Sequence, residues 1–290
     1  MTTLLIDADM LLFRTMTSLE VDCDMGDEVW IRYADIGQTR ELFWDHVAAM
    51  AKQFKTADHL FFWTGPSAFR RKIFPEYKAN RAGSKKPVGW TRMKRELLEE
   101  EHSYLHDEIE ADDWLGIFST ALTSSNQKHV IVSGDKDLDQ IPGEHHWPWG
   151  VKKEESLGLA VTQWLADSDQ IATGWTTDAH YSDRKFYEQI LEGDSTDNIS
   201  GCPGIGKVNA KRIVDKFDIS QPLECWEEIV QQYAKALTKK EDKRCPQEMA
   251  TLQARLVRIL RHGEYDVTTR TVDLWIPPTL KSVKESLVND

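Results

Sequence analysis

Short apolar runs alternate with amphipathic stretches in the first half of the chain, which indicates an α/β fold. The runs TLLID (3–7), HLFFW (59–63) and HVIVS (129–133) end at polar or turn residues, as buried parallel strands do. Helical periodicity lies between them, over residues 39–54 and 111–124. This alternation predicts βαβ units, and therefore a mostly parallel central sheet with helices on both faces.

From about residue 175 onward the pattern becomes helical, and one alternating run follows near the C-terminus. The expected helices are 180–192, 207–217, 222–237 and 246–261. The run VTTRTVDLW (267–275) predicts a strand that returns to the sheet or to its edge. We therefore expect a core over residues 1–175 and a helical part over residues 176–290.

Acidic residues follow strand ends or open helices in four separate segments of the predicted fold. The carboxyl ends of parallel strands share one edge of an open sheet, and ligands bind there. The oxygen donors expected at this edge are Asp7, Glu110, Asp112, Asp113, Asp135, Asp137, Asp194 and Asp197. Each acidic group alone is also explained as a helix cap or as a complement to a helix dipole.

Eight carboxylates at one edge would repel one another, and hard divalent cations relieve that repulsion. Ligation by oxygen alone favours Mg²⁺ or Mn²⁺ over zinc. Two such ions about 4 Å apart are a recurrent device for phosphodiester hydrolysis. The acids therefore predict phosphate chemistry.

The distribution of charge supports a partner that carries phosphates, although the whole chain is acidic. The net charge of −12 alone argues against nucleic acid. Residues 66–95, however, carry ten basic side chains and one acidic side chain, a net charge of +9. A glycine-rich turn, GCPGIGKVNAKR, also opens a basic helix in the second part, and such turns attract phosphates.

Composition and the N-terminal residues indicate an intracellular protein. The four cysteines are far apart and form no CxxC motif, which favours reduced thiols over disulfides or a zinc site. The segment MTTLLIDADMLLF lacks a basic region and is too short and too acidic for a signal or a membrane span. We expect a cytoplasmic protein with no membrane partner. His145 and His146 lie in a Trp/Pro-rich stretch and are expected at the surface.

Five motifs together resemble the 5′-nuclease superfamily of flap endonucleases, polymerase 5′-nuclease domains and 5′→3′ exonucleases of tailed phages. They are LLIDADMLLFR, FRRKIFPEYKANR, EIEADDWLGI, VIVSGDKDLDQI and EGDSTDNISGCPGIGKVNAKRIV, in the family's order. The length of the chain is most similar to that of the phage exonucleases. The resemblance implies a PIN/5′-nuclease-like core and a helical C-terminal part that contains a helix-hairpin-helix variant over about residues 198–216.

The resemblance also implies roles for individual residues. A first metal would be held mainly by Asp7, Glu110, Asp112 and Asp113, with Asp135 between two ions and Asp137, Asp194 and Asp197 on the second. Lys78 and Arg81 would contact the scissile phosphate, and Asp135 would be catalytic with them. Tyr77 would stack on a terminal base, or would instead pack beneath its loop.

Further nucleic-acid contacts are implied in two places. An arch over residues 82–106 would cover the active site, with phosphate contacts from its MKREL helix. The helix-hairpin-helix would bind duplex phosphates and hold a K⁺ ion through backbone carbonyls. The expected contact residues are Arg70, Tyr77, Lys78, Arg81, Lys85, Lys86, Arg92, Gly204, Gly206, Lys207, Lys211 and Arg212.

The resemblance thus implies a two-metal 5′→3′ exonuclease that acts at the 5′ ends, nicks or flaps of duplex DNA in phage replication, recombination or degradation of host DNA. RNA in RNA/DNA hybrids is a further expected substrate, and replication proteins are possible partners. Flap endonuclease is the alternative activity. A haloacid-dehalogenase-like phosphatase fits IDADM and SGDKD loosely, with Asp7 as nucleophile and Asp9 as acid, but it leaves EADD without a role.

One departure from the family pattern concerns the end of the second strand, where relatives usually carry an Asp. This chain has Trp63 or Thr64 at that place. A weaker first metal site is expected, unless water or Asp9 compensates. The departure also leaves open a DNA-binding relative that has lost turnover.

Overall fold

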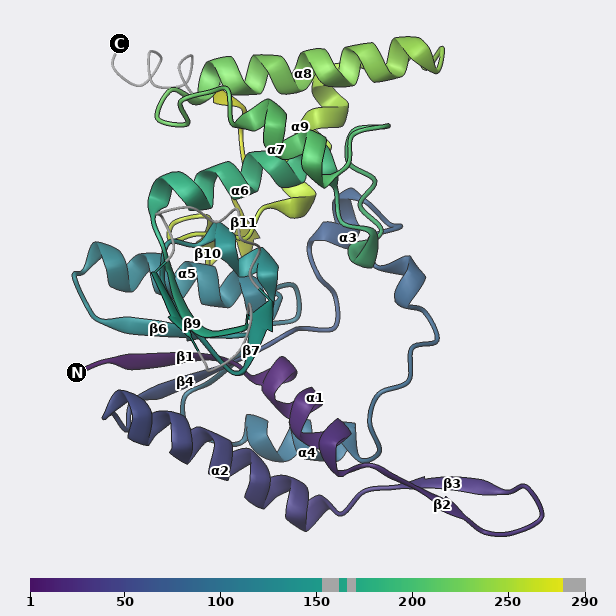
Figure 1. Ribbon diagram of the computed structural model, residues 1–290, viewed down its shortest axis with the longest axis vertical. Coiled ribbons are helices and arrows are strands. Elements are labelled where there is room, and N and C mark those ends of the chain that lie inside the picture. The colour runs from purple at the N-terminus through teal and green to yellow at the C-terminus, as the bar shows by residue number, and fades with distance from the viewer. Residues whose placement is uncertain (153–161, 166–170, 279–290) are drawn as a thin grey trace. The chain divides into compact units, whose positions relative to one another are not determined.

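The computed structural model describes residues 1–152, 162–165 and 171–278 of the chain (Figure 1). The chain divides into two compact units, each described here by itself. Unit 1 contains Met1–Ala68, Gly83–Leu138 and Gly143–Thr177, and unit 2 contains Phe69–Ala82, Asp139–Pro142 and Asp178–Asp290. We expected a helical part over residues 176–290, and its last twelve residues, 279–290, lie outside the described residues.

A sheet with seven strands among the described residues forms the centre of unit 1. In spatial order its strands are β5 (Ser103–Leu105), β4 (His59–Trp63), β1 (Thr3–Asp7), β6 (His129–Val132), β7 (Gly143–Lys152), β9 (Ile171–Thr177) and β8 (Thr162–Leu165). The first five are parallel to one another, whereas β9 pairs antiparallel with both β7 and β8. The predicted mostly parallel sheet is confirmed, and its antiparallel edge is an addition.

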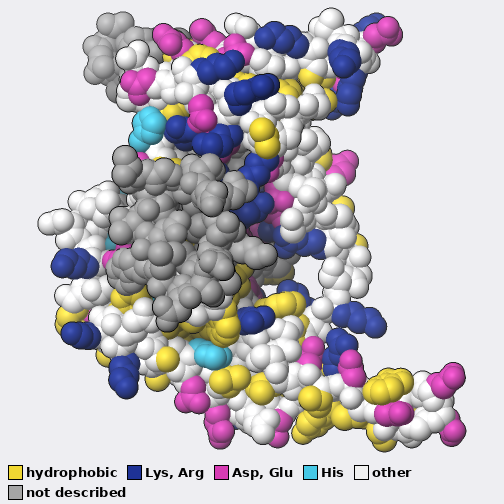
Figure 2. Space-filling model, in the orientation of Figure 1, with side chains coloured by type: hydrophobic (Ala, Val, Ile, Leu, Met, Phe, Trp, Pro, Cys, Tyr) yellow, Lys and Arg dark blue, Asp and Glu magenta, His cyan; other side chains and the backbone are white. Residues whose placement is uncertain are grey.

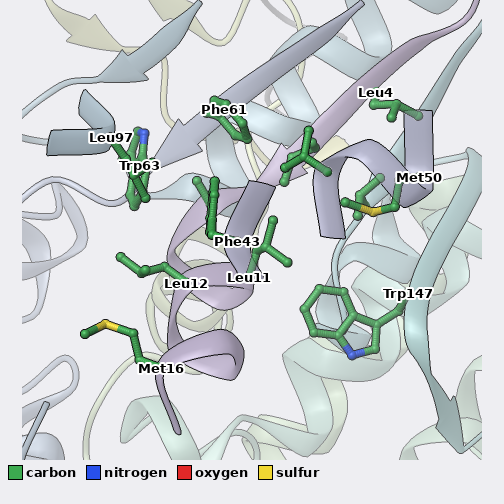
Figure 3. Packing of buried hydrophobic residues seen from close by; sticks show 14 of the residues in the cluster. Leu4, Leu11, Leu12, Met16, Phe43, Met50, Phe61, Trp63, Leu97 and Trp147 are labelled. Carbon is green, nitrogen blue, oxygen red and sulfur yellow. The ribbon is translucent and has the colours of Figure 1, made fainter. Parts of the chain in front are cut away.

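Helices cover both faces of this sheet (Figure 1). On one face lie α1 (Ala8–Leu19), α2 (Ile36–Phe54) and α4 (Trp90–Leu98), and on the other lies α5 (Ala111–Ser124). Successive strand residues point to opposite faces, so Leu4 and Ile6 of β1 face α1 and α2. They belong to a buried cluster that includes Leu11, Phe43 and Trp147 (Figure 3).

Local sequence explains where these helices begin and which face they bury. The Asp7 carboxylate accepts a hydrogen bond from Met10 N (3.0 Å) and caps α1. Asp35 caps α2 in the same way, accepting from Gln38 N (3.0 Å). Within α2 the buried residues Thr39, Phe43, Val47 and Met50 recur at helical spacing, which gives the helix one apolar face.

A β-hairpin between α1 and α2 was not expected from the sequence. It consists of β2 (Val21–Asp24) and β3 (Trp30–Tyr33), which pair antiparallel and form their own sheet. The pairs Val21–Tyr33 and Cys23–Ile31 share one face, while Asp22 and Arg32 form an ion pair on the other (2.8 Å). Figure 2 shows apolar side chains beside acidic side chains on this hairpin. The alternation follows the two-residue period of a strand with one apolar face.

Unit 2 is mainly helical. Its helices are α3 (Arg70–Ile73), α6 (Ala179–Glu192), α7 (Lys207–Val214), α8 (Pro222–Lys239) and α9 (Pro246–Val257). The helix α6 packs against α7, α8 and α9, and Tyr233 of α8 donates a hydrogen bond to the carbonyl of Ile190 in α6 (2.7 Å). The run 267–275 contains the short strand β11 (Thr271–Val272). Its predicted return to the central sheet is wrong, because β11 pairs with β10 (Tyr265–Asp266) in a separate hairpin.

Two histidines expected at the surface are buried in β7. His145 stacks on Trp175 with ring centroids 5.3 Å apart, and His146 lies edge-on to Phe54 at 5.1 Å. Burial lowers the pKa of His146 to about 4, because the cationic form is poorly solvated there. The expectation was wrong because the Trp and Pro residues around them form a buried strand, not a loop.

No helix among the described residues is both long enough and apolar enough to cross a membrane.

Candidate metal centre

Three acidic residues meet at the beginning of α5. Glu110 is its N-cap, and Asp112 and Asp113 lie in its first turn. Each of these residues offers one carboxylate oxygen, and the three oxygens lie within 4.8 Å of one another. Glu110 and Asp113 are buried, with 3% and 0% of their surfaces exposed. These three acids therefore lie together, and their role as metal ligands stays a prediction.

Asp7 lies at the carboxyl end of β1, and α5 packs against this strand. Its carboxylate accepts hydrogen bonds from Met10 N (3.0 Å) and from Ser133 Oγ (2.9 Å). Burial nevertheless raises the pKa of Asp7 to about 7, and the charges of Asp9 and Asp135 add to the rise. A bound cation would favour the ionised form of Asp7, so this residue fits a metal ligand.

The turn after β6 holds two further predicted ligands beside Asp7. Ser133 Oγ donates to Asp7 and accepts from Asp135 N (3.1 Å), which joins the ends of β1 and β6. Asp137 N in turn donates to Asp135 Oδ1 (2.9 Å). Sequence reasoning missed Ser133, although its place directly after a buried strand and before Gly134 was a usable signal.

The strand end that lacks the expected Asp is occupied by polar contacts of Thr64. Trp63 is fully buried in the core cluster, so Thr64 is the residue at this edge. Its hydroxyl accepts a hydrogen bond from Ala111 N (3.1 Å), within the first turn of α5. Its own N–H donates to Asp9 Oδ2 (2.6 Å). Thr64 therefore connects Asp9 to the helix that carries Glu110, Asp112 and Asp113.

Asp194 and Asp197 lie in unit 2, around a 3₁₀ turn labelled η4 (Ser195–Asp197). Asp194 caps this turn, accepting from Thr196 N (2.7 Å). The Asp197 carboxylate forms ion pairs with Lys78 (3.4 Å) and Arg81, and accepts from Tyr77 Oη (3.1 Å). The convergence of these two acids with those of unit 1 stays a prediction.

The segment around Lys78 and Arg81 is fixed to the η4 turn through its backbone as well. Lys78 N donates to the carbonyl of Asp197 (2.9 Å), and Asn80 Nδ2 donates to the carbonyl of Ser195 (2.8 Å). Tyr77 is only 2% exposed, so of its two expected roles the packing role describes this structure. Sequence reasoning missed Asn80, whose side chain joins this segment to the η4 turn.

Arg70 is a correction to the expected nucleic-acid contacts. It is 2% exposed, and its guanidinium donates to the carbonyls of Leu256 (2.9 Å) and Arg258 at the end of α9. The guanidinium N–H groups thereby pair with carbonyls that the end of a helix leaves without a partner. Arg70 therefore has a structural role in unit 2 and no access to a phosphate.

The basic side chains of the predicted arch over residues 82–106 lie in unit 1. Lys86 Nζ lies 4.6 Å from the centroid of the Trp90 ring, and the exposed Arg92 pairs with Glu96 (3.0 Å) on α4. Lys85 is exposed. The region expected as an arch over residues 82–106 contains α4 and β5. Nucleic-acid binding by Lys85, Lys86 and Arg92 stays a prediction.

The glycine turn before α7 leaves its backbone accessible. Gly204 has φ +83°, which favours glycine, and a Cβ at Gly204 or Gly206 would meet nothing within 4 Å. Gly206 is the N-cap of α7 and makes no side-chain cap. On this helix Lys211 pairs with Asp215 (3.5 Å), and Arg212 donates to Asn209 Oδ1 (3.0 Å). Lys207 opens the helix, so the turn presents N–H groups and positive charge together.

Clustered carboxylates at the carboxyl edge of a parallel sheet define a class of metal-dependent hydrolases that act on phosphate esters. Residues 2–161 match the family model of the 5′-3′ exonuclease N-terminal resolvase-like domain, and the chain belongs to that family. The predicted family and the predicted activity, a metal-dependent 5′→3′ exonuclease, are thereby confirmed.

Individual relatives agree with this assignment. The chain is 28% identical to the exodeoxyribonuclease of Enterobacteria phage T3, covering 94% of this chain and 92% of the relative. It is 27% identical to the exonuclease of Escherichia phage T7, covering 94% and 93%. Among solved structures, a bacteriophage T5 protein crystallised with metal ions superposes with a TM-score of 0.57 at 16% identity, covering 89% of each chain, which shows a shared fold.

Proposed function

We propose that this chain is a Mg²⁺-dependent 5′→3′ exonuclease that acts on the 5′ ends of duplex DNA and releases mononucleotides or short oligonucleotides. The observation that carries the proposal is the meeting of Glu110, Asp112 and Asp113 at one point on α5. These three residues offer only carboxylate oxygens, which suits Mg²⁺ or Mn²⁺. The raised pKa of Asp7, about 7, is a second sign that this edge takes up a cation.

Two metal ions would activate water and stabilise the leaving oxygen at such a site. Asp7, Glu110, Asp112 and Asp113 would hold the first ion, Asp135 would lie between the ions, and Asp137, Asp194 and Asp197 would hold the second. Lys78 and Arg81 would exchange part of their attraction to Asp197 for the phosphate, and so offset charge that develops during hydrolysis. Asn80 would orient them through its bond to the η4 turn.

The duplex would be bound through sequence-independent phosphate contacts. Gly204 and Gly206 would let backbone N–H groups approach a phosphate, and Lys207, Lys211 and Arg212 would supply charge. We propose that residues 198–216 form the helix-hairpin-helix variant, with K⁺ bound by backbone carbonyls. The arch over residues 82–106 would add contacts from Lys85, Lys86 and Arg92.

Flap cleavage is the second candidate activity. Relatives named flap endonuclease Xni match this chain, for example at 28% identity over 53% of the chain. A T5 flap endonuclease solved with DNA and metal ions also shares the fold, with a TM-score of 0.56. The two activities differ in whether the arch admits a free 5′ strand. We propose the cytoplasm of the phage host as the place of action, RNA/DNA hybrids as further substrates and replication proteins as partners.

The decisive experiment uses duplex DNA with a 5′ label and separates the products by size in the presence of Mg²⁺. Immediate release of labelled mononucleotide, lost with EDTA and in Asp135→Asn, is the expected result. Labelled oligonucleotides released from a flapped duplex would favour the flap endonuclease. Tight DNA binding without cleavage in Mg²⁺ or Mn²⁺ would overturn both and leave a DNA-binding protein without turnover.

A further inference from the structure

Lys94 of α4 reaches the edge of the sheet where the expected strand-end Asp is missing. Its ammonium donates to Asp9 Oδ1 (2.8 Å) and to the carbonyl of Thr64 (3.0 Å). Its Nζ also lies 5.3 Å from the centroid of the Trp63 ring. Lys94 and Asp9 are 19% and 20% exposed, so this ion pair is largely shielded from water. These contacts lie entirely within unit 1.

The contacts of Lys94 continue to the acids of α5. Asp9 accepts from Thr64 N through Oδ2 (2.6 Å), while its other oxygen faces Lys94. Thr64 Oγ1 accepts from Ala111 N (3.1 Å), and Ala111 stands between Glu110 and Asp112. A chain of hydrogen bonds therefore joins α4, the end of β4 and the first turn of α5.

Asp9 already has a cationic partner within the chain. Each of its carboxylate oxygens is engaged, one by an ammonium and one by a backbone N–H. A divalent cation bound by Asp9 would lie beside the Lys94 ammonium, and the repulsion between the two positive charges disfavours that role.

We propose that Lys94 is a positioning residue that neutralises Asp9, keeps it out of the metal coordination, and thereby weakens the first metal site. The inference rests on the proposed function, because it concerns the same cation. The ion pair holds the end of β4 and the start of α5 in register with α4. The charge of Asp9 is balanced by the chain itself, and the first cation depends on the remaining acids alone.

The test is a cycle of variants read out by Mn²⁺ binding in titration calorimetry, without DNA. Lys94→Met removes a positive charge and frees Asp9, so Mn²⁺ should bind about tenfold more tightly. Asp9→Asn leaves the ammonium unbalanced, so binding should weaken by about tenfold. The Asp9→Asn/Lys94→Met double variant removes both charges and should return to within about threefold of the wild type.

Two control variants separate local from general effects. Arg95→Met removes the same charge from the neighbouring, exposed position of α4 and should leave Mn²⁺ affinity nearly unchanged. Lys94→Arg keeps the charge and should retain the wild-type affinity. Thermal unfolding of each variant identifies any that fails to fold. Should Lys94→Met fail to fold, Lys94→Gln would replace it, with the same expected tightening.

Each outcome has a defined meaning. A double variant that binds Mn²⁺ as weakly as Asp9→Asn would make Asp9 a metal ligand and overturn the inference. Equal affinities for Lys94→Met and Arg95→Met would overturn it as well. In both cases wild-type Mn²⁺ binding that is lost in Asp135→Asn would leave the proposed function standing. Wild-type protein that neither binds Mn²⁺ nor cleaves DNA would overturn the proposed function itself.

Discussion

Asp7 in unit 1 and Asp197 in unit 2 are both predicted metal ligands, but their surroundings differ. Asp7 is buried, has Asp9 and Asp135 nearby, and has a pKa raised to about 7. Asp197 is paired with Lys78 and Arg81 and accepts from Tyr77. Carboxylates gathered without enough positive charge favour uptake of a cation, whereas carboxylates paired within the chain are already stabilised. We therefore expect the electrostatics of unit 1 to depend most on a bound metal.

The largest expected effect comes from the three acids at the beginning of α5, Glu110, Asp112 and Asp113. Asp113→Asn removes a proposed metal ligand while nearly preserving the shape of the side chain. We expect nuclease activity to fall about 10³-fold, because a bound cation would stabilise the reaction by several kcal/mol. Initial rates on labelled duplex measure it. Asp24→Asn, on the exposed β2 strand, is the matched control and should keep its activity. Full activity of Asp113→Asn would mean that the trio holds no metal needed for catalysis.

The paired acids of unit 2 should respond to loss of a cationic partner instead. Arg81→Met removes one ion pair of Asp197 and one proposed phosphate contact, so we expect activity to fall about 10²-fold. The exposed Arg71 of α3 lies in the same unit, and Arg71→Met is the control. Equal rates for the two variants would show that Arg81 serves only the general attraction of DNA.

The burial of His146 in unit 1 predicts how the free energy of unfolding depends on pH. The pKa of His146 falls from 6.5 to about 4 on folding. The unfolded chain therefore binds a proton in this window that the folded chain does not, and stability is lost as pH falls from 6.5 towards 4. The loss attributable to His146 is on the order of 3 kcal/mol.

Denaturant unfolding at pH 7 and pH 4.5 measures this loss of stability. His146→Phe should flatten the dependence, because Phe cannot be protonated. The exposed His180 of unit 2 provides the comparison, and His180→Gln should retain the wild-type dependence. An unchanged pH dependence in His146→Phe would assign the effect to other groups.

The smallest expected effect comes from a variant that adds an acid to unit 1. Thr64→Asp restores the carboxylate that the family usually carries and can still accept from Ala111 N. We expect the Mg²⁺ concentration for half-maximal activity to fall by roughly threefold to tenfold, because one more negative charge attracts the cation. Thr64→Asn introduces a neutral side chain of the same size as Asp and should leave this Mg²⁺ concentration unchanged. An identical Mg²⁺ requirement before and after Thr64→Asp would contradict a weakened first site.

Local patterns determined how much could be predicted. The bounds of β1, β4 and α5 follow from apolar runs and helical periodicity, and the acids of α5 were found because neighbours in one helical turn must lie close. The β2–β3 hairpin was missed although β2 alternates apolar and acidic residues, because β3 begins with the adjacent apolar residues Trp30 and Ile31. Arg70 was misassigned because its partners, Leu256 and Arg258, are more than 180 positions away in sequence, so charge alone suggested a phosphate contact.

The segment that carries Lys78 and Arg81 depends on residues synthesised much later. Its hydrogen bonds reach Ser195 and Asp197, and Arg70, at its start, is held by carbonyls at Leu256 and Arg258. In a nascent chain the full set of contacts made by residues 70–81 can form only after residue 258 has left the ribosome. The order of synthesis therefore places the completion of these contacts near the end of translation.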